Sequence, residues 1–221
     1  MAKPKVAILH TFLYAVNDMQ KFFRDWVPEV EIFNIIDDTL LAEALENKGT
    51  TPGIISRYCD YARIAENLGA DCILSQCSSM KRASETARNC VNIPVLTLDT
   101  PMMEEAVSLG NDIALVCTSN STVSASTELL TDTANASGKD CKITTYYCDG
   151  AYDALLKEGD ADKHNAIVLD YVKKAAEKHD VIVMAQGSHY HLRPLLEKHV
   201  SIPVLTSPEG GVKQIRKVLG L

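Results

Sequence analysis

Two short stretches of the sequence carry similar polar residues at the end of an apolar run. "SQCSSM" spans Ser75–Met80 and "AQGSHY" spans Ala185–Tyr190. The first holds Cys77, whose thiolate can take a proton and return it. The second has Gly187 in the matching place when the two Gln-X-Ser strings are aligned. One motif therefore occurs twice, with a reactive side chain in only one copy.

Cys77 stands between a predicted buried strand and a predicted helix, "SSMKRASETARNC". A thiol at a helix N-terminus lies near unpaired backbone N–H groups, so we expect a lowered pKa. Ser78 and Ser79 can cap this helix and offer hydroxyl and amide groups to a carboxylate. Free cysteines are often only small buried hydrophobes, and that interpretation is favoured for the other six, Cys59, Cys72, Cys90, Cys117, Cys141 and Cys148.

A second polar stretch is "ALVCTSNSTV", in which an apolar strand gives way to hydroxyl and amide side chains before a helix. Thr118, Ser119 and Asn120 in this stretch form a candidate anion cradle. A capped helix start without a ligand fits the same residues equally well. The stretch lacks the Gly-Lys pair of a P-loop, so a nucleotide phosphate is not favoured.

The second copy of the motif contributes further candidates. His189 follows Gly187 by two residues and can act as an acid or base near neutral pH, although loop histidines are more often solvated. Gln186 and Ser188 flank Gly187 and are candidates for substrate binding. Thr11 is another, since it follows His10 at the end of the first predicted strand.

The bulk composition is that of an ordinary globular protein. The chain has 221 residues, 46% hydrophobic and 23% charged, with a net charge of −7. An acidic chain argues against nucleic acid or an anionic membrane as a partner, and no apolar run is long enough to span a bilayer. We interpret the N-terminal "MAKPKVAILH" as a first strand rather than a signal peptide. Seven scattered cysteines, without CxxC or zinc spacing, favour a reducing cytoplasm and no metal site.

Apolar runs alternate with helical spacing along the whole chain. The clearest helix is predicted between Ile54 and Leu68, and it ends at Gly69. "ANASGKD" (Ala134–Asp140) is predicted to be a loop. This alternation predicts an α/β fold with parallel sheets. The predicted strands are Val6–Leu9, Val30–Ile35, Cys72–Ser75, Val95–Leu98, Ile113–Cys117, Ile143–Tyr147, Val181–Ala185 and Val204–Thr206.

An internal repeat organises these elements. "VNIPVLTLDT" (Val91–Thr100) matches "VSIPVLTSPE" (Val200–Glu209), with the shared Ile-Pro-Val-Leu-Thr strings 109 positions apart. Gln76 and Gln186 are 110 positions apart. The repeat predicts two similar α/β halves, residues 1–100 plus 207–221 and residues 101–206. Because ligands bind beyond the carboxyl ends of parallel strands, we expect the two Gln-X-Ser turns to face a shared cleft.

Taken together, these motifs resemble the aspartate/glutamate racemase superfamily, which includes hydantoin racemases, maleate isomerases and arylmalonate decarboxylases. The resemblance covers nearly the whole chain and implies two Rossmann-like halves related by a pseudo-two-fold axis, with the active site between them. It also implies a reaction without cofactors, a small carboxylate or amino-acid substrate, and a homodimer. The motifs that carry it are "VAILHT", "NIIDDTL", "GADCILSQCSSM", "IPVLTLDTPMMEEAV", "IALVCTSNST", "DVIVMAQGS" and "IPVLTSPEGGV".

Racemases of this superfamily use one cysteine from each half, on opposite faces of the substrate's α-carbon. By resemblance, Cys77 matches the first-half cysteine. The resemblance also implies that five residues bind carboxylate groups, namely Ser78, Ser79, Thr118, Ser119 and Asn120. The second-half cysteine is absent, and Gly187 stands in its place, followed by Ser188.

Three functions remain open on the sequence. The first is a cofactor-independent racemase or isomerase in which Cys77 transfers a proton and His189 or another group replaces the second thiol. The second is a single-thiol decarboxylase or other lyase acting on a substituted malonate or dicarboxylate. The third is a carboxylate-binding protein without turnover. The resemblance favours the first.

Overall fold

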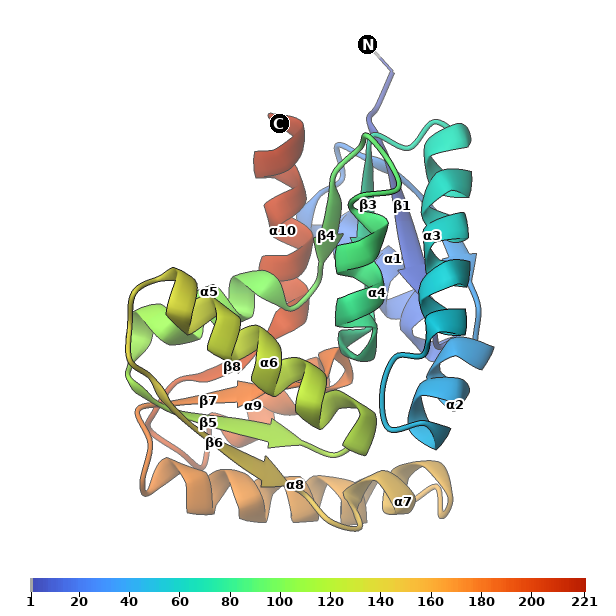
Figure 1. The fold of residues 1–221 in the computed structure, drawn as a ribbon. Helices are drawn as coiled ribbons and strands as arrows, with labels where there is room; N and C mark the ends of the chain where they lie inside the picture. Colours follow the sequence, from blue (N-terminus) through green and yellow to red (C-terminus); the bar gives the residue numbers. More distant parts are fainter. Residues whose placement is uncertain (1) are drawn as a thin grey trace. The chain divides into compact units, whose positions relative to one another are not determined.

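The computed structural model describes residues 2–221, and in it helices and parallel strands alternate along the chain (Figure 1). The chain divides into two compact units. Unit 1 comprises the residues up to Pro101 together with Pro208–Leu221, and unit 2 is Met102–Ser207. Each unit holds one four-stranded sheet in which all strands run parallel. The predicted α/β fold is confirmed.

Unit 1 is built on a sheet of order β2-β1-β3-β4. Its strands are β1 (Lys5–His10), β2 (Glu31–Ile36), β3 (Cys72–Ser75) and β4 (Val95–Thr97). In the view of Figure 1, α3 and α4 lie in front of this sheet and α1 lies behind it. The helices are α1 (Tyr14–Trp26), α2 (Thr39–Glu46), α3 (Pro52–Asn67), the 3-10 helix η1 (Ser78–Met80), α4 (Lys81–Ala87) and α10 (Ser207–Leu219).

Strand periodicity builds the core of unit 1. In β1, Ala7 and Leu9 face the same side of the sheet and join one apolar cluster with residues of α2, α3 and α4. The helix α3 begins where the sequence supplies a start signal, since the Thr51 side chain accepts a hydrogen bond from the backbone of Ile54 and Pro52 follows it. These helices fix the turn after β3, which connects the sheet to α4.

Unit 2 repeats this plan with the order β6-β5-β7-β8. Its strands are β5 (Asp112–Cys117), β6 (Lys142–Tyr147), β7 (Val181–Met184) and β8 (Val204–Thr206). One face packs against α5 and α6, and the other against α7, α8 and α9. The helices are α5 (Thr100–Leu109), α6 (Asn120–Ala136), α7 (Ala151–Leu156), α8 (Ala161–Ala176), the 3-10 helix η2 (Gly187–Leu192) and α9 (Arg193–Leu196).

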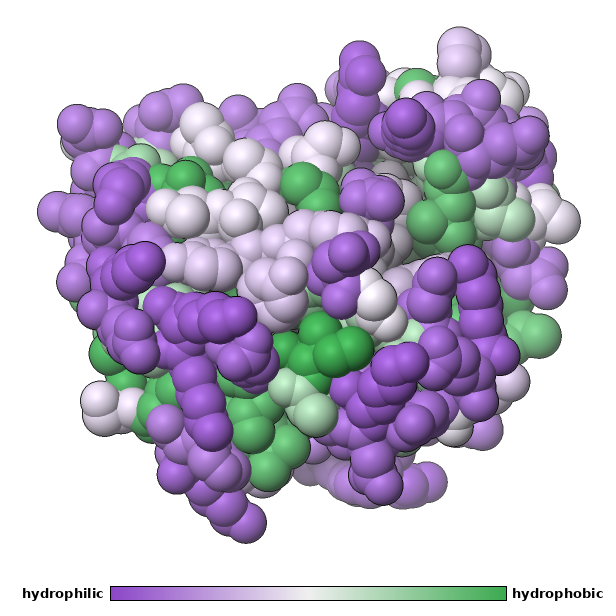
Figure 2. Space-filling view, turned by 90° about the horizontal axis from the view of Figure 1, so that it is seen from below, coloured by the Kyte–Doolittle hydropathy of each residue, from purple (hydrophilic) through white to green (hydrophobic). Residues whose placement is uncertain are grey.

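The eight predicted strands are confirmed within one or two residues at their ends. One prediction was partly wrong, because α6 continues through Ala136, so the loop within Ala134–Asp140 begins only at Ser137. Figure 2 shows one face on which hydrophilic residues surround small apolar patches. In residues 2–221 no helix combines the length and the apolar character needed to cross a membrane.

Candidate functional site

The carboxyl edge of the unit 1 sheet carries Cys77, the predicted acid–base residue. Cys77 follows β3, while His10 and Thr11 come from the end of β1. Asp99, which follows β4, is buried with only 3% of its surface exposed. Parallel strands bring their carboxyl ends to one edge of a sheet, so these side chains gather around the turn that contains Cys77.

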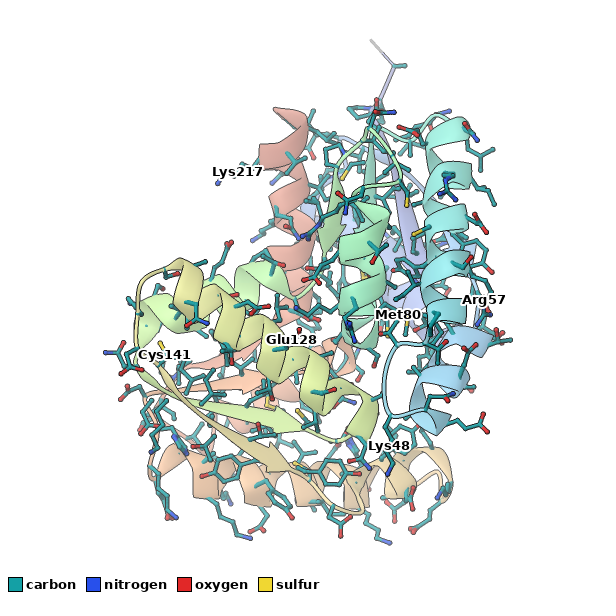
Figure 3. All side chains as sticks on the ribbon, viewed as in Figure 1. Lys48, Arg57, Met80, Glu128, Cys141 and Lys217 are labelled. Carbon is teal, nitrogen blue, oxygen red and sulfur yellow. The ribbon has the colours of Figure 1, made fainter. Side chains whose placement is uncertain are left out.

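Backbone hydrogen bonds hold the Cys77 turn closed. The Gln76 amide donates to Leu9 of the neighbouring strand at 3.1 Å, and the Met80 amide donates to the Cys77 carbonyl at 3.0 Å. The Thr50 hydroxyl, from the loop between α2 and α3, donates to the Ser79 carbonyl at 3.2 Å. Figure 3 labels Met80 at the beginning of α4. The thiol is thus presented by a short, braced turn.

A charged cluster fixes the loop that supplies Thr50. Arg57 of α3, labelled in Figure 3, donates to Asp37 at 2.9 Å and also pairs with Glu43 of α2. The Tyr61 hydroxyl donates to the same carboxylate of Asp37 at 2.7 Å. These contacts tie α2 to α3 and so determine where their connecting loop meets the Cys77 turn.

The pKa of Cys77 is raised, contrary to the expectation from the helix N-terminus. Burial of the thiol is the largest cause, and the negative charge of Asp99 acts in the same direction. Hydrogen bonding from the Thr11 hydroxyl and from the amide and hydroxyl of Ser79 lowers the pKa but does not outweigh burial. The helix that follows is a single 3-10 turn. At neutral pH without a ligand, Cys77 is therefore mainly a thiol.

Nδ1 of His10 and Oε1 of Gln76 are among the buried side-chain atoms at this edge that have no hydrogen-bond partner. Nε2 of His10 lies 2.9 Å from Oδ1 of Asn34, an arrangement that places the proton on Nε2 and leaves Nδ1 as an acceptor. Burial lowers the pKa of His10, which keeps the ring neutral at pH 7. Buried polar atoms are nearly always paired, so these two mark a place for a ligand or water.

The carboxyl edge of the unit 2 sheet carries hydrogen-bond donors. The backbone amide of Thr118 donates to Oε1 of Gln186 at 2.7 Å, and the Thr118 hydroxyl donates to the same atom at 3.1 Å. Because a backbone N–H can only donate, the amide oxygen of Gln186 must face Thr118, which fixes the orientation of the side chain. The hydroxyls of Thr206 and Ser207 are buried and without a partner.

Strand pairing corrects the correspondence between the two motifs. In unit 1, Ser75 of β3 pairs with Leu9 and Thr97. In unit 2, Met184 of β7 pairs with Val116 and Thr206 in the same way, so Ser75 corresponds to Met184, 109 residues later. At this offset Cys77 corresponds to Gln186. Gly187 corresponds to Ser78.

The turns themselves confirm this correspondence. Cys77 precedes η1 with φ −99° and ψ 121°, and Gln186 precedes η2 with φ −124° and ψ 132°. The amide of His189 donates to the Gln186 carbonyl at 3.0 Å, as that of Met80 does to the Cys77 carbonyl. The position that matches the thiol therefore holds an amide side chain, and the alignment by letters placed it one residue too far along.

His189 is not an exposed loop residue. It lies within η2 with 2% of its surface exposed, and neither ring nitrogen has a hydrogen-bond partner. Burial, and to a lesser degree the neighbouring His164, lowers its pKa to about 3. The two imidazole rings lie 6.1 Å apart. His189 is therefore neutral at physiological pH, and no local sequence pattern indicated that it is buried.

The remaining predicted residues fall into two groups, one in each unit. In unit 1, Ser78 is half-buried and Ser79 is buried beside the thiol. In unit 2, Ser119 is buried with its hydroxyl 3.0 Å from that of Ser121, whereas Asn120 and Ser188 are exposed. Within residues 2–221, no group of three or more His, Cys, Asp or Glu side chains is placed to hold a metal ion.

Sequence reasoning missed three residues at these edges. Asn34 holds His10, Asp99 acts on the thiol, and Tyr58 lies beneath the Cys77 turn. Asp99 could have been found, since it follows the predicted strand Val95–Leu98 directly. Tyr58 could not, because its place in the predicted helix gave no indication of which hydroxyl it would meet.

The model of the Asp/Glu/hydantoin racemase family matches residues 15–216. The chain belongs to this family. No curated protein sequence matches it. The matched residues include the Cys77 turn of unit 1 and the Gln186 turn of unit 2, and they begin after β1.

Solved structures of several racemases have the same fold. Allantoin racemase from Klebsiella pneumoniae superposes with a TM-score of 0.76 at 15% identity, and the superposition covers 99% of this chain and 88% of that one. Aspartate racemase from Picrophilus torridus has a TM-score of 0.74 at 16% identity, covering 98% and 94%. A mutant of arylmalonate decarboxylase has a TM-score of 0.66 at 15% identity, covering 98% and 94%. At these identities the similarity establishes the fold.

Proposed function

We propose that the protein is a cofactor-independent racemase or isomerase that moves a proton at the α-carbon of a small carboxylate or amino acid. Cys77 is the acid and base in this proposal. Thr11, Ser78 and Ser79 in unit 1, with Thr118, Ser119, Asn120, Gln186, Gly187 and Ser188 in unit 2, are the candidate substrate contacts. Family membership supports the reaction class.

One observation carries the proposal. A partly buried thiol lies on a strand edge where His10 Nδ1 and Gln76 Oε1 are buried and unpaired. Both are acceptors, and Asp99 adds a negative charge near the sulfur. A ligand that supplies N–H donors would satisfy both atoms. This favours an amino acid or an amide derivative over a simple dicarboxylate.

The chemical step is a reversible proton transfer. The thiolate of Cys77 takes the α-proton, the C–H electron pair moves into the carboxyl or amide group as an enediolate, and the resulting thiol returns a proton to carbon. Hydroxyl and amide donors stabilise the developing oxyanion. Because burial raises the pKa of Cys77 in the free protein, the thiolate must form as substrate binds or as donors close on the sulfur.

The test is exchange of the α-proton for deuterium in heavy water, followed by NMR. The panel contains amino acids, their amide derivatives and small dicarboxylates, each with the wild type and Cys77→Ser. We expect the variant to lose exchange by about 100-fold or more, the usual size of a general acid–base contribution. Cys90→Ser is the matched control, since Cys90 is also a partly buried thiol of unit 1.

Two outcomes would contradict the proposal. Exchange that persists in Cys77→Ser would remove the thiol from the chemistry. Absence of exchange with every compound, together with ligand-dependent protection of Cys77 from alkylation, would favour a carboxylate-binding protein.

A second candidate function rests on Gln186. An amide side chain at the position that corresponds to Cys77 can donate hydrogen bonds but cannot take or return a proton near neutral pH. A site with one titrating thiol suits a reaction on one face of the carbon, as in a decarboxylase. Release of carbon dioxide from a substituted malonate, lost in Cys77→Ser, would favour this candidate over a racemase.

The proposed compartment is the cytoplasm. All seven cysteines are free, as expected in a reducing environment. A homodimer remains part of the proposal only through the family resemblance.

A further inference from the structure

Three hydroxyl groups form a buried chain directly beneath the Cys77 turn. The Tyr58 hydroxyl lies 2.6 Å from the Ser75 hydroxyl, and the Ser84 hydroxyl lies 2.8 Å from the same Ser75 oxygen. Ser84 also donates to the Met80 carbonyl at 2.9 Å. All three side chains are at least 99% buried. Burial raises the pKa of Tyr58 far above its usual range, so its hydroxyl keeps its proton.

This chain connects the two ends of the catalytic turn. Ser75 is the last residue of β3, two positions before Cys77, and Ser84 lies in α4. Tyr58 reaches the pair from α3, which packs against α4. The strand end, the helix after the turn and the neighbouring helix are therefore held by one set of hydrogen bonds.

Unit 2 serves as an internal control, since it has the same frame without this chain. Met184 corresponds to Ser75 through the pairing of β5 with β7. Counted from the capping residues Thr51 and Asp160, Ile167 of α8 corresponds to Tyr58. Met184 is a buried member of one apolar cluster of unit 2, and Ile167 packs against that cluster. At these two positions the fold accepts apolar side chains in unit 2, whereas in unit 1 they carry hydroxyls under the turn that holds the thiol.

Energetics point the same way. Replacing both partners of a buried hydrogen bond with apolar groups of the same shape is nearly neutral for stability. Stability alone therefore does not require three buried hydroxyls at this place. Ser79, which hydrogen-bonds to the sulfur of Cys77, lies on the turn that they brace.

We propose that Tyr58, Ser75 and Ser84 are positioning residues that hold the Cys77 turn so that the Ser79 donors stay on the sulfur. They do not touch substrate. This inference rests on the proposed function in that it explains how the thiol is prepared for proton transfer. Its test uses the thiol itself and needs no knowledge of the substrate.

The experiment measures alkylation of Cys77 by iodoacetamide from neutral to alkaline pH, with mass spectrometry of the peptide that contains it. Tyr58→Phe removes one hydroxyl of the chain. Tyr146→Phe is the matched control, because it removes one tyrosine hydroxyl from β6 of unit 2, where that hydroxyl lies 2.9 Å from Nε2 of His179. Ser84→Ala is the second variant of the chain, and circular dichroism verifies that each variant is folded.

We expect the midpoint of Cys77 alkylation in Tyr58→Phe to rise by about one pH unit, with about tenfold slower reaction at neutral pH, because the Ser79 donors are no longer held. Ser84→Ala should shift in the same direction, and Tyr146→Phe should match the wild type. An unchanged or lowered midpoint in the folded chain variants would overturn the inference, as would an equal shift in Tyr146→Phe. If Tyr58→Phe does not fold, Ser84→Ala decides.

This result is separable from that of the proposed function. Loss of exchange in Cys77→Ser with no shift in the alkylation profiles would keep the reaction and reject the positioning chain. A shifted alkylation profile with no exchange in the wild type or any variant would keep the positioning chain and reject the proposed reaction.

Discussion

The Cys77 turn and the Gln186 turn have nearly the same backbone and different chemistry. Each follows the third strand of its unit, precedes a 3-10 helix and closes with a hydrogen bond to its own carbonyl. Cys77 can titrate and accepts hydrogen bonds from Thr11 and Ser79, whereas Gln186 cannot titrate and is held by the donors of Thr118. The comparison teaches that the duplicated frame fixes where a group stands and leaves open what the group does.

The strongest way to break this comparison is to give both turns a thiol. Gln186→Cys places a cysteine at the position that corresponds to Cys77, and Gly187→Cys places one a residue later. In the site that the family resemblance implies, the second half supplies the group on the opposite face of the α-carbon, so with a substrate that exchanges its α-proton we expect Gln186→Cys to raise inversion about tenfold or more. Chiral analysis of the product during exchange measures it.

Gly187→Cys is the matched control for this prediction, and it should leave the ratio of inversion to exchange unchanged. The opposite result, with inversion from Gly187→Cys alone, would show that the correspondence by sequence letters describes the site better than strand pairing does.

A second way to sharpen the comparison concerns the residues three positions after Cys77 and three positions after Gln186. Met80 in unit 1 corresponds to His189 in unit 2, and both are buried. The pKa of His189 is lowered from 6.5 to about 3, so the unfolded chain binds a proton more readily than the folded one. Stability contributed by the neutral ring is present above pH 6.5 and is lost as the pH falls toward 3.

For His189→Met we therefore expect a weaker dependence of stability on acid. The wild type should lose about 2 kcal/mol of unfolding free energy between pH 7 and pH 5 through this residue, and the variant should lose none of it. Urea unfolding at both pH values measures the difference. His191→Gln, at an exposed histidine of the same 3-10 helix, is the control. Equal acid sensitivity in His189→Met and wild type would contradict the burial of a neutral ring.

The smallest expected effect compares two helix caps. Thr51 accepts from the Ile54 amide at the start of α3, and Asp160 accepts from the Lys163 amide at the start of α8. Replacing either with Ala should cost about 1 kcal/mol. Thr51→Ala should cost more, because the Thr51 hydroxyl also contacts Glu43 in the cluster around Arg57. Urea unfolding decides, and a larger loss in Asp160→Ala would show that this cluster adds nothing to the cap.

Sequence patterns were sufficient for the fold. Apolar runs and the internal repeat placed all eight strands, because the central strands β1, β3, β5 and β7 are almost entirely buried and their sequences are nearly continuous apolar segments. The carboxyl ends of β1 and β3 also followed from these patterns, and in the structure the Thr11 hydroxyl at the end of β1 hydrogen-bonds to the Cys77 thiol.

What the sequence could not supply is the environment of each group. The direction of the Cys77 pKa shift depends on burial and on Asp99, and no local pattern reports either. The burial of His189 depends on the packing of η2, which starts with Gly187 and resembles a loop in sequence. The letters of "QCS" and "QGS" match at an offset of 110, whereas the paired strands and the Ile-Pro-Val-Leu-Thr strings share an offset of 109, so the letters alone do not locate the structural counterpart of Cys77.

The similar extended backbone conformations of Cys77 and Gln186 have a consequence for how such a protein can diverge. After duplication, either copy of the turn can gain or lose its reactive group by a single codon change without rebuilding the backbone. A lineage could thereby pass from two reactive groups to one, or move the remaining one to the other copy, through folded intermediates at every step. The repeated frame makes new reactions accessible to drift.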